Sequence, residues 1–290
     1  MGHRPVRRPR APLRRDDQRL RPPGLGIDLL QRLLVRTVST LVMVPIALGI
    51  LWLGGWWFAA AATAVAIYAT VEWNRVTASA RPALTVVNAT TLVLAAAALL
   101  EVNGWTALVF LGVGAVLVLG VAAVRRAVPF WPVFGLAYLG VALLSLVWLR
   151  QAGGFFAVLW VLLIIWGSDI GAYLTGSLLG GPKLAPRLSP NKTWAGLLGG
   201  AVLAGAVSTG VVLLAPPGLA ALSSPAPMFL VGFVLAVWSQ AGDILESTIK
   251  RRFNVKDSGT LIPGHGGVLD RIDSLIFTVP VVALAFFLQN

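Results

Sequence analysis

Long apolar runs, separated by short polar or glycine- and proline-rich segments, make up most of the chain. A helix needs about 20 residues to cross a hydrocarbon core about 30 Å thick, and the runs have roughly that length. The pattern therefore predicts nine membrane-spanning helices, at residues 35–53, 56–73, 84–100, 105–124, 130–149, 154–175, 194–215, 227–247 and 272–288. We expect an all-α fold, a polytopic transmembrane helix bundle of about nine spans.

The positive charges fall on one side of this predicted bundle. With a cytoplasmic amino terminus and nine crossings, all of the 23 lysines and arginines except Arg150 lie on the inner side, as the positive-inside rule requires. The outer loops, such as 215–227, are short or consist of Pro, Ala and Ser, so they leave no room for a catalytic domain. We predict a multi-pass protein of the plasma (cytoplasmic) membrane whose active site faces the cytoplasm.

Composition supports the membrane assignment and limits the chemistry. The 290 residues are 57% hydrophobic and 12% charged, with a mean hydropathy of +0.84, whereas about a quarter of the residues of a soluble domain are charged. The chain has no cysteine, which excludes disulfides and thiolate metal sites. Carboxylates or histidine must therefore hold any metal ion.

The pattern divides the chain into three regions. Residues 1–30 form a basic tail rich in Arg and Pro, residues 31–150 form amino-terminal transmembrane helices, and residues 151–290 form a carboxy-terminal transmembrane catalytic region. We interpret the tail as disordered and cytoplasmic, in contact with anionic membrane lipids. No nucleic-acid partner is expected, because arginines before a first apolar run have this simpler explanation.

A few ionisable groups lie inside or at the edge of a span, where each costs about 2.5 to 3.5 kcal/mol at a helix centre. Five carboxylates among them are candidates for chemistry: Asp169, Asp243, Glu246, Asp270 and Asp273. Helical spacing places Asp243 on one face with Ser247 and Lys250, and it places Asp270 and Asp273 on another face. Two such faces between neighbouring helices offer oxygen ligands only, which suits Mg²⁺ bridging phosphates.

The segment between these two acidic faces mixes cations with glycines. Residues 250–267 include Arg251 and Lys256, and Arg271 follows. Cationic side chains neutralise a polyphosphate, and glycines allow backbone N–H groups to approach its oxygens. The alternative is that these are ordinary inner-side charges and an ordinary turn. His265 is either a loop residue or a phosphate donor or proton carrier.

A second inner loop, 176–193, repeats this combination of cations with Gly and Pro. For Ser189, Lys192 and Thr193 the alternatives are a helix cap, a solvated charge, or a functional role beside Asp169. The glycines at 196, 199, 200 and 205 are typical of close helix packing.

These motifs resemble a known family. The stretch 247–273 reads Ser-x-Ile-Lys-Arg-x4-Lys-Asp-x-Gly-x2-Ile-Pro-x-His-Gly-Gly-Val-x-Asp-Arg-Ile-Asp, which is similar to the signature of the phosphatidate cytidylyltransferases, or CDP-diacylglycerol synthases. Residues 169–180 (Asp-x2-Ala-Tyr-x2-Gly-x3-Gly), Lys183 and 189–193 (Ser-Pro-x-Lys-Thr) look like a second region of that family. The motifs lie in the carboxy-terminal half. Ala195 departs from the pattern, because a glutamate is expected there.

The resemblance implies an enzyme that joins CTP to phosphatidic acid and releases CDP-diacylglycerol and pyrophosphate, with Mg²⁺ as cofactor. It implies that Asp243 and Asp270 bind the metal, supported by Asp273 and Glu246. The residues implied to bind substrate or balance its charge are Lys250, Ser247, Arg251, Lys256, His265, Arg271, Lys192, Ser189 and Asp169. A homodimer is also expected from the resemblance.

Two other functions compete with this one. A membrane kinase that uses CTP to phosphorylate a lipid alcohol would share the carboxylates and basic loops, but it would release CDP. An anion transporter would explain charges within the membrane, but it needs polar groups on both faces. The outer half of this chain is nearly bare of charge, which favours an enzyme.

Overall fold

The computed structural model describes residues 41–124, 129–214, 225–261 and 266–289. The described elements are a short helix Leu41–Leu53, α2 (Gly55–Val76), α3 (Pro82–Glu101), α4 (Gly104–Val124), α5 (Phe130–Leu179), β1 (Lys183–Ala185), β2 (Ser189–Thr193), α6 (Trp194–Leu214), α8 (Pro225–Arg252) and α9 (Leu269–Gln289). The predicted all-α architecture is confirmed. The predicted tail, residues 1–30, lies outside the described residues.

Every predicted apolar run is helical wherever it is described, but the number of spans is not established. Within the described ranges, six helices are long and apolar enough to cross a membrane. One of them, α5, contains two of the predicted spans, 130–149 and 154–175. They are joined without a loop at Gly154, whose φ of 71° interrupts the helical backbone and is a conformation that glycine adopts at little cost.

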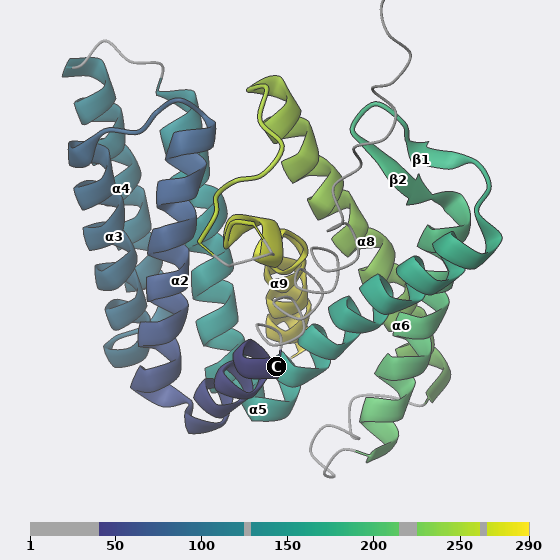
Figure 1. Cartoon of the computed structure of the whole chain (residues 1–290). Coiled ribbons are helices and arrows are strands. Elements are labelled where there is room, and N and C mark those ends of the chain that lie inside the picture. Colours follow the sequence, from purple (N-terminus) through teal and green to yellow (C-terminus); the bar gives the residue numbers. More distant parts are fainter. Residues whose placement is uncertain (1–40, 125–128, 215–224, 262–265, 290) are drawn as a thin grey trace, which may run out of the picture.

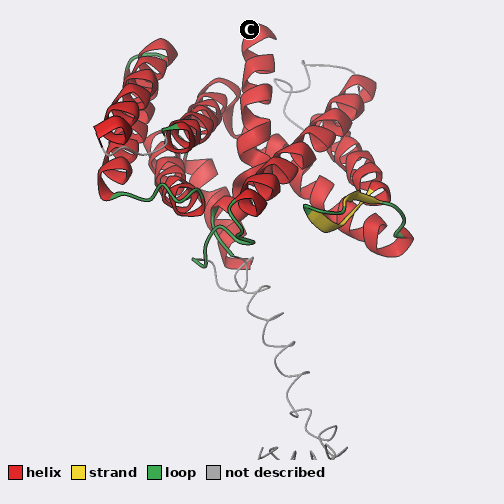
Figure 2. Ribbon diagram, turned by 90° about the horizontal axis from the view of Figure 1, so that it is seen from above, coloured by secondary structure: helices red, strands yellow, loops and turns green. Residues whose placement is uncertain are grey.

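The helices form two groups on either side of α9 (Figure 1, Figure 2). One group contains α2, α3 and α4, and the other contains α6 and α8. Helix α5 belongs to both groups, because it bends sharply at the bottom of Figure 1 and contacts helices of each group as well as α9. The hairpin and the carboxyl end of α8 lie on the upper side in this view, whereas the last described residues lie below.

Aromatic side chains mark the lower ends of the helices. Trp52, Trp57 and Trp105 are exposed at the end of the first short helix and at the starts of α2 and α4. Tryptophan is enriched where a membrane meets water. The exposed ring positions therefore agree with a bundle whose lower end lies at a membrane interface.

The one cation predicted to lie on the outer side has a structural role. Arg150 donates hydrogen bonds from Nε to the carbonyl oxygen of Leu51 at 2.9 Å and from its terminal nitrogen to that of Trp52 at 3.2 Å. These two carbonyl groups lie at the carboxyl end of the first short helix, where the helix itself provides no N–H donors for them. Arg150 thus satisfies a helix end.

Glycines allow α5 and α6 to pack closely, as the sequence predicted. A Cβ on Gly200 would lie 2.6 Å from the carbonyl oxygen of Ser168, and a Cβ on Gly171 would lie 2.8 Å from that of Gly199. A side chain at either position would force the helices apart. The close contact fixes the part of α5 that carries Asp169.

The second inner loop was predicted without strands, but it forms a two-stranded antiparallel hairpin. Lys183 pairs with Thr193, and Ala185 pairs with Ser189. The hydroxyl of Thr193 then accepts a hydrogen bond from the backbone N–H of Gly196 at 3.0 Å. Thr193 is therefore the amino-terminal cap of α6, one of the alternatives left open by the sequence.

Candidate active site

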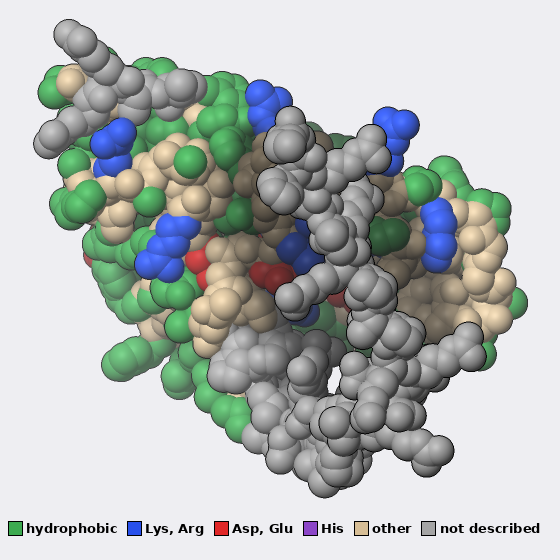
Figure 3. Space-filling model, turned by 45° about the horizontal axis from the view of Figure 1, so that its top comes forward, with side chains coloured by type: hydrophobic (Ala, Val, Ile, Leu, Met, Phe, Trp, Pro, Cys, Tyr) green, Lys and Arg blue, Asp and Glu red, His purple; other side chains and the backbone are tan. Residues whose placement is uncertain are grey.

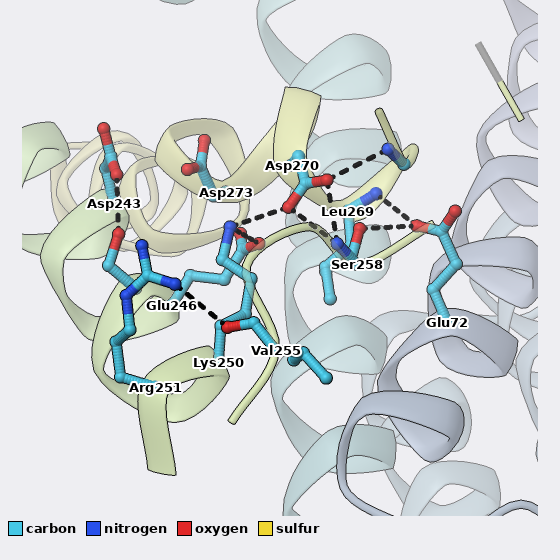
Figure 4. Close-up of polar contacts among 12 residues, drawn as sticks. Glu72, Asp243, Glu246, Lys250, Arg251, Val255, Ser258, Leu269, Asp270 and Asp273 are labelled. Atoms are coloured by element: carbon cyan, nitrogen blue, oxygen red, sulfur yellow. Dashed lines mark hydrogen bonds and ion pairs between the residues drawn. The ribbon is translucent and has the colours of Figure 1, made fainter. Parts of the chain in front are cut away.

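Polar side chains gather where α5, α8, α9 and the hairpin meet. On the upper face of the molecule, acidic side chains lie in a central hollow with lysine and arginine side chains around it (Figure 3). The close-up in Figure 4 shows the acidic residues at the end of α8 and the start of α9. Most of the carboxylates predicted from the sequence are therefore close together.

The first part of the site is the Lys192 cluster, formed by Asp169, Lys192, Gln240, Asp243 and Ser247. Lys192 forms an ion pair with Asp243 and donates a hydrogen bond to Gln240 Oε1 at 2.7 Å. The Gln240 amide in turn donates to Asp169 Oδ1 at 3.5 Å. On the other side, the Ser247 hydroxyl donates to Asp243 Oδ1 at 3.4 Å. The cluster links α5, β2 and α8.

A cavity of about 440 Å³ opens beside the Lys192 cluster. Its wall includes three members of the cluster that carry charge, Asp169, Lys192 and Asp243, together with Tyr173 and Asn191. The ammonium group can bind an anionic oxygen, and the carboxylates can bind a cation or a donor group. This combination suits a ligand that carries both phosphate groups and a bound cation.

The second part of the site is the Lys250 cluster, in which Lys250 lies between Glu246 and Asp270. Its Nζ is 2.7 Å from Asp270 Oδ1 and 3.0 Å from Glu246 Oε1. Asp270 also accepts backbone hydrogen bonds from Ser258 at 2.9 Å and Gly267 at 2.9 Å (Figure 4). Asp270 is thus fixed from three directions before any ligand binds.

Asp273 lies between the two clusters. In Figure 4 it lies between Asp243 and Asp270, and its negative charge interacts with the charges of Asp243 and Glu246. Among the described residues, Oε2 of the buried Glu246 has no hydrogen-bond donor, and Oε1 is paired with Lys250. The row of carboxylates therefore has unused acceptor capacity next to two lysines.

The donor atoms in this row suit a hard cation such as Mg²⁺, which prefers carboxylate oxygens and retains water ligands. In the described part of the chain, no group of three or more His, Cys or acidic residues is close enough to hold an ion. Instead Lys192 and Lys250 neutralise Asp243 and Asp270. The residues fit the ion by chemistry, and binding would require the lysines to exchange a carboxylate partner for a phosphate.

Four other predicted residues do not belong to either cluster. The charge of Arg271 interacts with Asp169, and the Arg251 side chain donates to the carbonyl oxygen of Val255 at 3.2 Å. Lys256 is exposed. Ser189 is paired with Ala185 in the hairpin. His265 lies outside the described residues.

Sequence reasoning missed two residues of the site. Gln240 joins Lys192 to Asp169, and its place one helical turn before Asp243 is the only signal that the sequence offered. Glu72, on α2, accepts a hydrogen bond from the Ser258 hydroxyl at 3.1 Å. Glu72 lies inside the second apolar run, so the criterion that selected Asp169 would also have found it.

Comparisons with known proteins agree with the motifs. Residues 34–289 match the sequence profile of the cytidylyltransferase family. The chain is 36% identical over 272 residues to a phosphatidate cytidylyltransferase of Brucella melitensis, an alignment that covers 88% of this chain and 93% of that protein.

Two further relatives match a shorter part of the chain. A phosphatidate cytidylyltransferase of Rickettsia bellii is 44% identical over 129 residues, 44% of this chain and 54% of that protein. One of Bacillus subtilis is 43% identical over 126 residues, 42% of this chain and 44% of that protein. Because the profile match and the Brucella alignment both span nearly the whole chain, this chain belongs to the cytidylyltransferase family.

Proposed function

We propose that this chain is a phosphatidate cytidylyltransferase, which transfers CMP from CTP to phosphatidic acid and yields CDP-diacylglycerol and pyrophosphate. The observation that carries the proposal is the pair of lysine–carboxylate clusters beside a polar cavity at one end of an apolar helix bundle. One substrate is a lipid and the other a water-soluble polyphosphate, so the reaction needs a site of this kind. Relatives with this name support the assignment, and the alignment covers 93% of the length of the Brucella melitensis protein.

In the proposed reaction, a phosphate oxygen of phosphatidic acid attacks the α-phosphorus of CTP. The new P–O bond forms as the bond between the α-phosphorus and the β-phosphate breaks, and pyrophosphate leaves with the electron pair. The phosphate of phosphatidic acid is ionised at neutral pH, so no general base is needed. Catalysis then depends on holding the groups in line and neutralising charge.

The two lysines have the central part in this neutralisation. Lys192 holds Asp243 at the wall of the polar cavity, and Lys250 holds Asp270. Each lysine can turn its ammonium group to a phosphate oxygen when substrate binds. Arg251, Lys256 and Arg271 would add positive charge around the triphosphate and the lipid phosphate.

Magnesium would be held by Asp243 and Asp270, with Asp273 and Glu246 as further oxygen donors, and would polarise the phosphates and shield their charge. Asp169, Ser247 and Gln240 orient the Lys192 cluster through hydrogen bonds. Ser189 and His265 remain candidate substrate contacts from the motif alone.

We also propose that the chain crosses the inner membrane nine times, with the amino terminus and the site at the cytoplasmic face, and that it forms a homodimer. The direction of α5 on either side of Gly154 supports the crossing pattern, because both ends of this helix point to the upper side of Figure 1. Basic residues at that side support its cytoplasmic assignment.

The purified protein, incubated with CTP, phosphatidic acid and magnesium, tests the activity. We expect stoichiometric CDP-diacylglycerol and pyrophosphate. Formation of a phosphorylated lipid and CDP would instead establish a lipid kinase. If neither phosphatidic acid nor diacylglycerol reacts, both assignments are contradicted. Diacylglycerol in place of phosphatidic acid provides the control, because it lacks the attacking phosphate.

A further inference from the structure

A buried carboxylate from the amino-terminal half reaches the start of α9. Glu72 on α2 is 0% exposed. It accepts hydrogen bonds from the backbone N–H of Leu269 at 2.8 Å, from that of Val268 at 3.1 Å and from the Ser258 hydroxyl at 3.1 Å (Figure 4). A buried carboxylate requires such donors, because burial without them is very unfavourable.

Two of these donors are backbone N–H groups at the amino-terminal end of α9. Leu269 is the first residue of α9 and Val268 precedes it, so their backbone N–H groups have no acceptor within the helix. A negative charge at this end also interacts favourably with the helix dipole. Glu72 therefore acts as the cap of α9, although it comes from a different helix, and the capped turn carries Asp270.

The same backbone segments hold Asp270. The backbone N–H of Ser258 donates to Asp270 while its hydroxyl donates to Glu72, so this one residue connects the two carboxylates. The N–H of Gly267 donates to Asp270, and that of the next residue, Val268, donates to Glu72. Any displacement of Glu72 therefore changes the position of two donors to Asp270.

The approach of these segments to Glu72 leaves no room for side chains. A Cβ on Gly259 would collide with Glu72 Oε1, and a Cβ on Gly267 would lie 2.7 Å from Oε2. These two glycines of the motif, for which the sequence left phosphate binding or an ordinary turn as alternatives, are thus needed here for contact with a carboxylate.

We infer that Glu72 is a positioning residue of the cytidylyltransferase reaction: it fixes the first turn of α9 and thereby the orientation of the Asp270 carboxylate. The inference rests on the proposed function and on the part given there to Asp270. A purely structural Glu72 would instead stabilise the whole bundle, without a selective effect on this turn or on turnover.

Hydrogen exchange and kinetics of Glu72→Gln in the purified full-length chain separate these cases. The amide keeps the size of the side chain, but its NH₂ group faces N–H donors and cannot accept from them. We expect the Val268 and Leu269 amides to exchange at least tenfold faster, with unchanged exchange in α6 (Trp194–Leu214). The kcat at saturating CTP and phosphatidic acid should fall at least tenfold per folded molecule.

Glu101→Gln is the matched control. Like Glu72, Glu101 lies on a helix of the amino-terminal half, but it is exposed, and within the described part of the chain it accepts one hydrogen bond, from Trp56 Nε1 at 3.0 Å. The same change from acid to amide should leave both the exchange of the α9 amides and kcat at the wild-type level.

Three results would overturn the inference: unchanged exchange at Val268 and Leu269, faster exchange throughout the chain, or a wild-type kcat despite a released α9 turn. If Glu72→Gln does not fold, Ser258→Ala is used in its place, because it removes only the hydrogen bond from the Ser258 hydroxyl to Glu72. A wild-type kcat in that variant would also count against the inference. Wild-type protein that forms no CDP-lipid would refute the proposed function, whereas the exchange comparison tests the cap independently of activity.

Discussion

Asp243 and Asp270 lie in different ion pairs, yet the row of carboxylates between them predicts that they act in one event. Replacing either by Asn keeps its size and removes the charge needed to hold Mg²⁺. Each single change should lower the rate at least about a hundredfold, or about 2.7 kcal/mol of barrier, and the double change should cost little more.

The measurement is magnesium-dependent formation of CDP-lipid by both single variants and the double variant, normalised to folded protein. Glu101→Gln serves as the control for loss of a carboxylate outside the site. Multiplying losses in the double variant would mean that the two residues act independently, and near-normal activity in either single variant would remove that residue from the site.

Lys192 provides a second test, because it holds Asp243 and Gln240 at the wall of the cavity. If it binds a phosphate of CTP, Lys192→Gln loses a charged hydrogen bond of about 1.5 to 3 kcal/mol, and kcat/KM for CTP should fall at least about tenfold. Arg187→Gln is the control, since Arg187 is an exposed cation of the same hairpin segment. Equal kinetics for the two variants would exclude the lysine from CTP binding.

At the residue scale, helical spacing and the sequence motifs predicted most residues of the candidate site but not the contacts between them. Asp243 and Ser247 share a hydrogen bond because they lie one turn apart, which the sequence shows directly. The contact between Glu72 and Ser258 joins residues 186 positions apart. No local pattern encodes such a distance, because it depends on how α2 packs beside α9.

Helix packing can be tested with two glycines of α6. A Cβ on Gly200 would lie 2.6 Å from a carbonyl oxygen of α5, whereas a Cβ on Gly210 would meet nothing within 4 Å. Gly200→Ala should therefore destabilise the fold by about 1 to 3 kcal/mol through overpacking, whereas Gly210→Ala should be neutral or stabilise the helix by up to about 1 kcal/mol.

Thermal unfolding in detergent, followed by the loss of helical signal, measures both variants. The comparison uses the same substitution on the same helix, so a general effect of alanine cancels. Equal unfolding temperatures for the two variants would show that α5 and α6 can separate without cost.

At the element scale, apolar periodicity predicted the helices well because each span must be long and apolar. It did not predict that 130–149 and 154–175 follow each other directly within α5. Gly154 changes the direction of the backbone there without a connecting loop. The hairpin was also missed. Its strands have three and five residues and lack strict alternation of buried and exposed positions, which is the signal by which a strand is recognised.

The crossing pattern of the whole molecule predicts which connections share a side of the membrane. The chain has no cysteine, so single cysteines report their own accessibility. We expect Arg81→Cys and Arg187→Cys to react with an impermeant reagent from the cytoplasmic side and Val102→Cys to react from the opposite side. Labelling of all three from one side would contradict the nine-span arrangement.

For the whole molecule, the motifs predict a catalytic region in residues 151–290, and the sequence describes the amino-terminal half only as apolar. The family match nevertheless begins at residue 34. Contact of α2 with the α9 turn gives a physical reason for that extent, because a carboxylate of the first half completes a structure in the second.

This contact also sets an order in time. Glu72 leaves the ribosome 186 residues ahead of Ser258, which at 5–20 residues per second is a delay of roughly 10 to 40 s. During that interval α2 has to carry an acid among apolar helices without the donors that later satisfy it. Closure of the α9 turn on Glu72 is therefore a late event in biosynthesis, and a nascent chain that stops before residue 258 retains an unsatisfied acid within its helices.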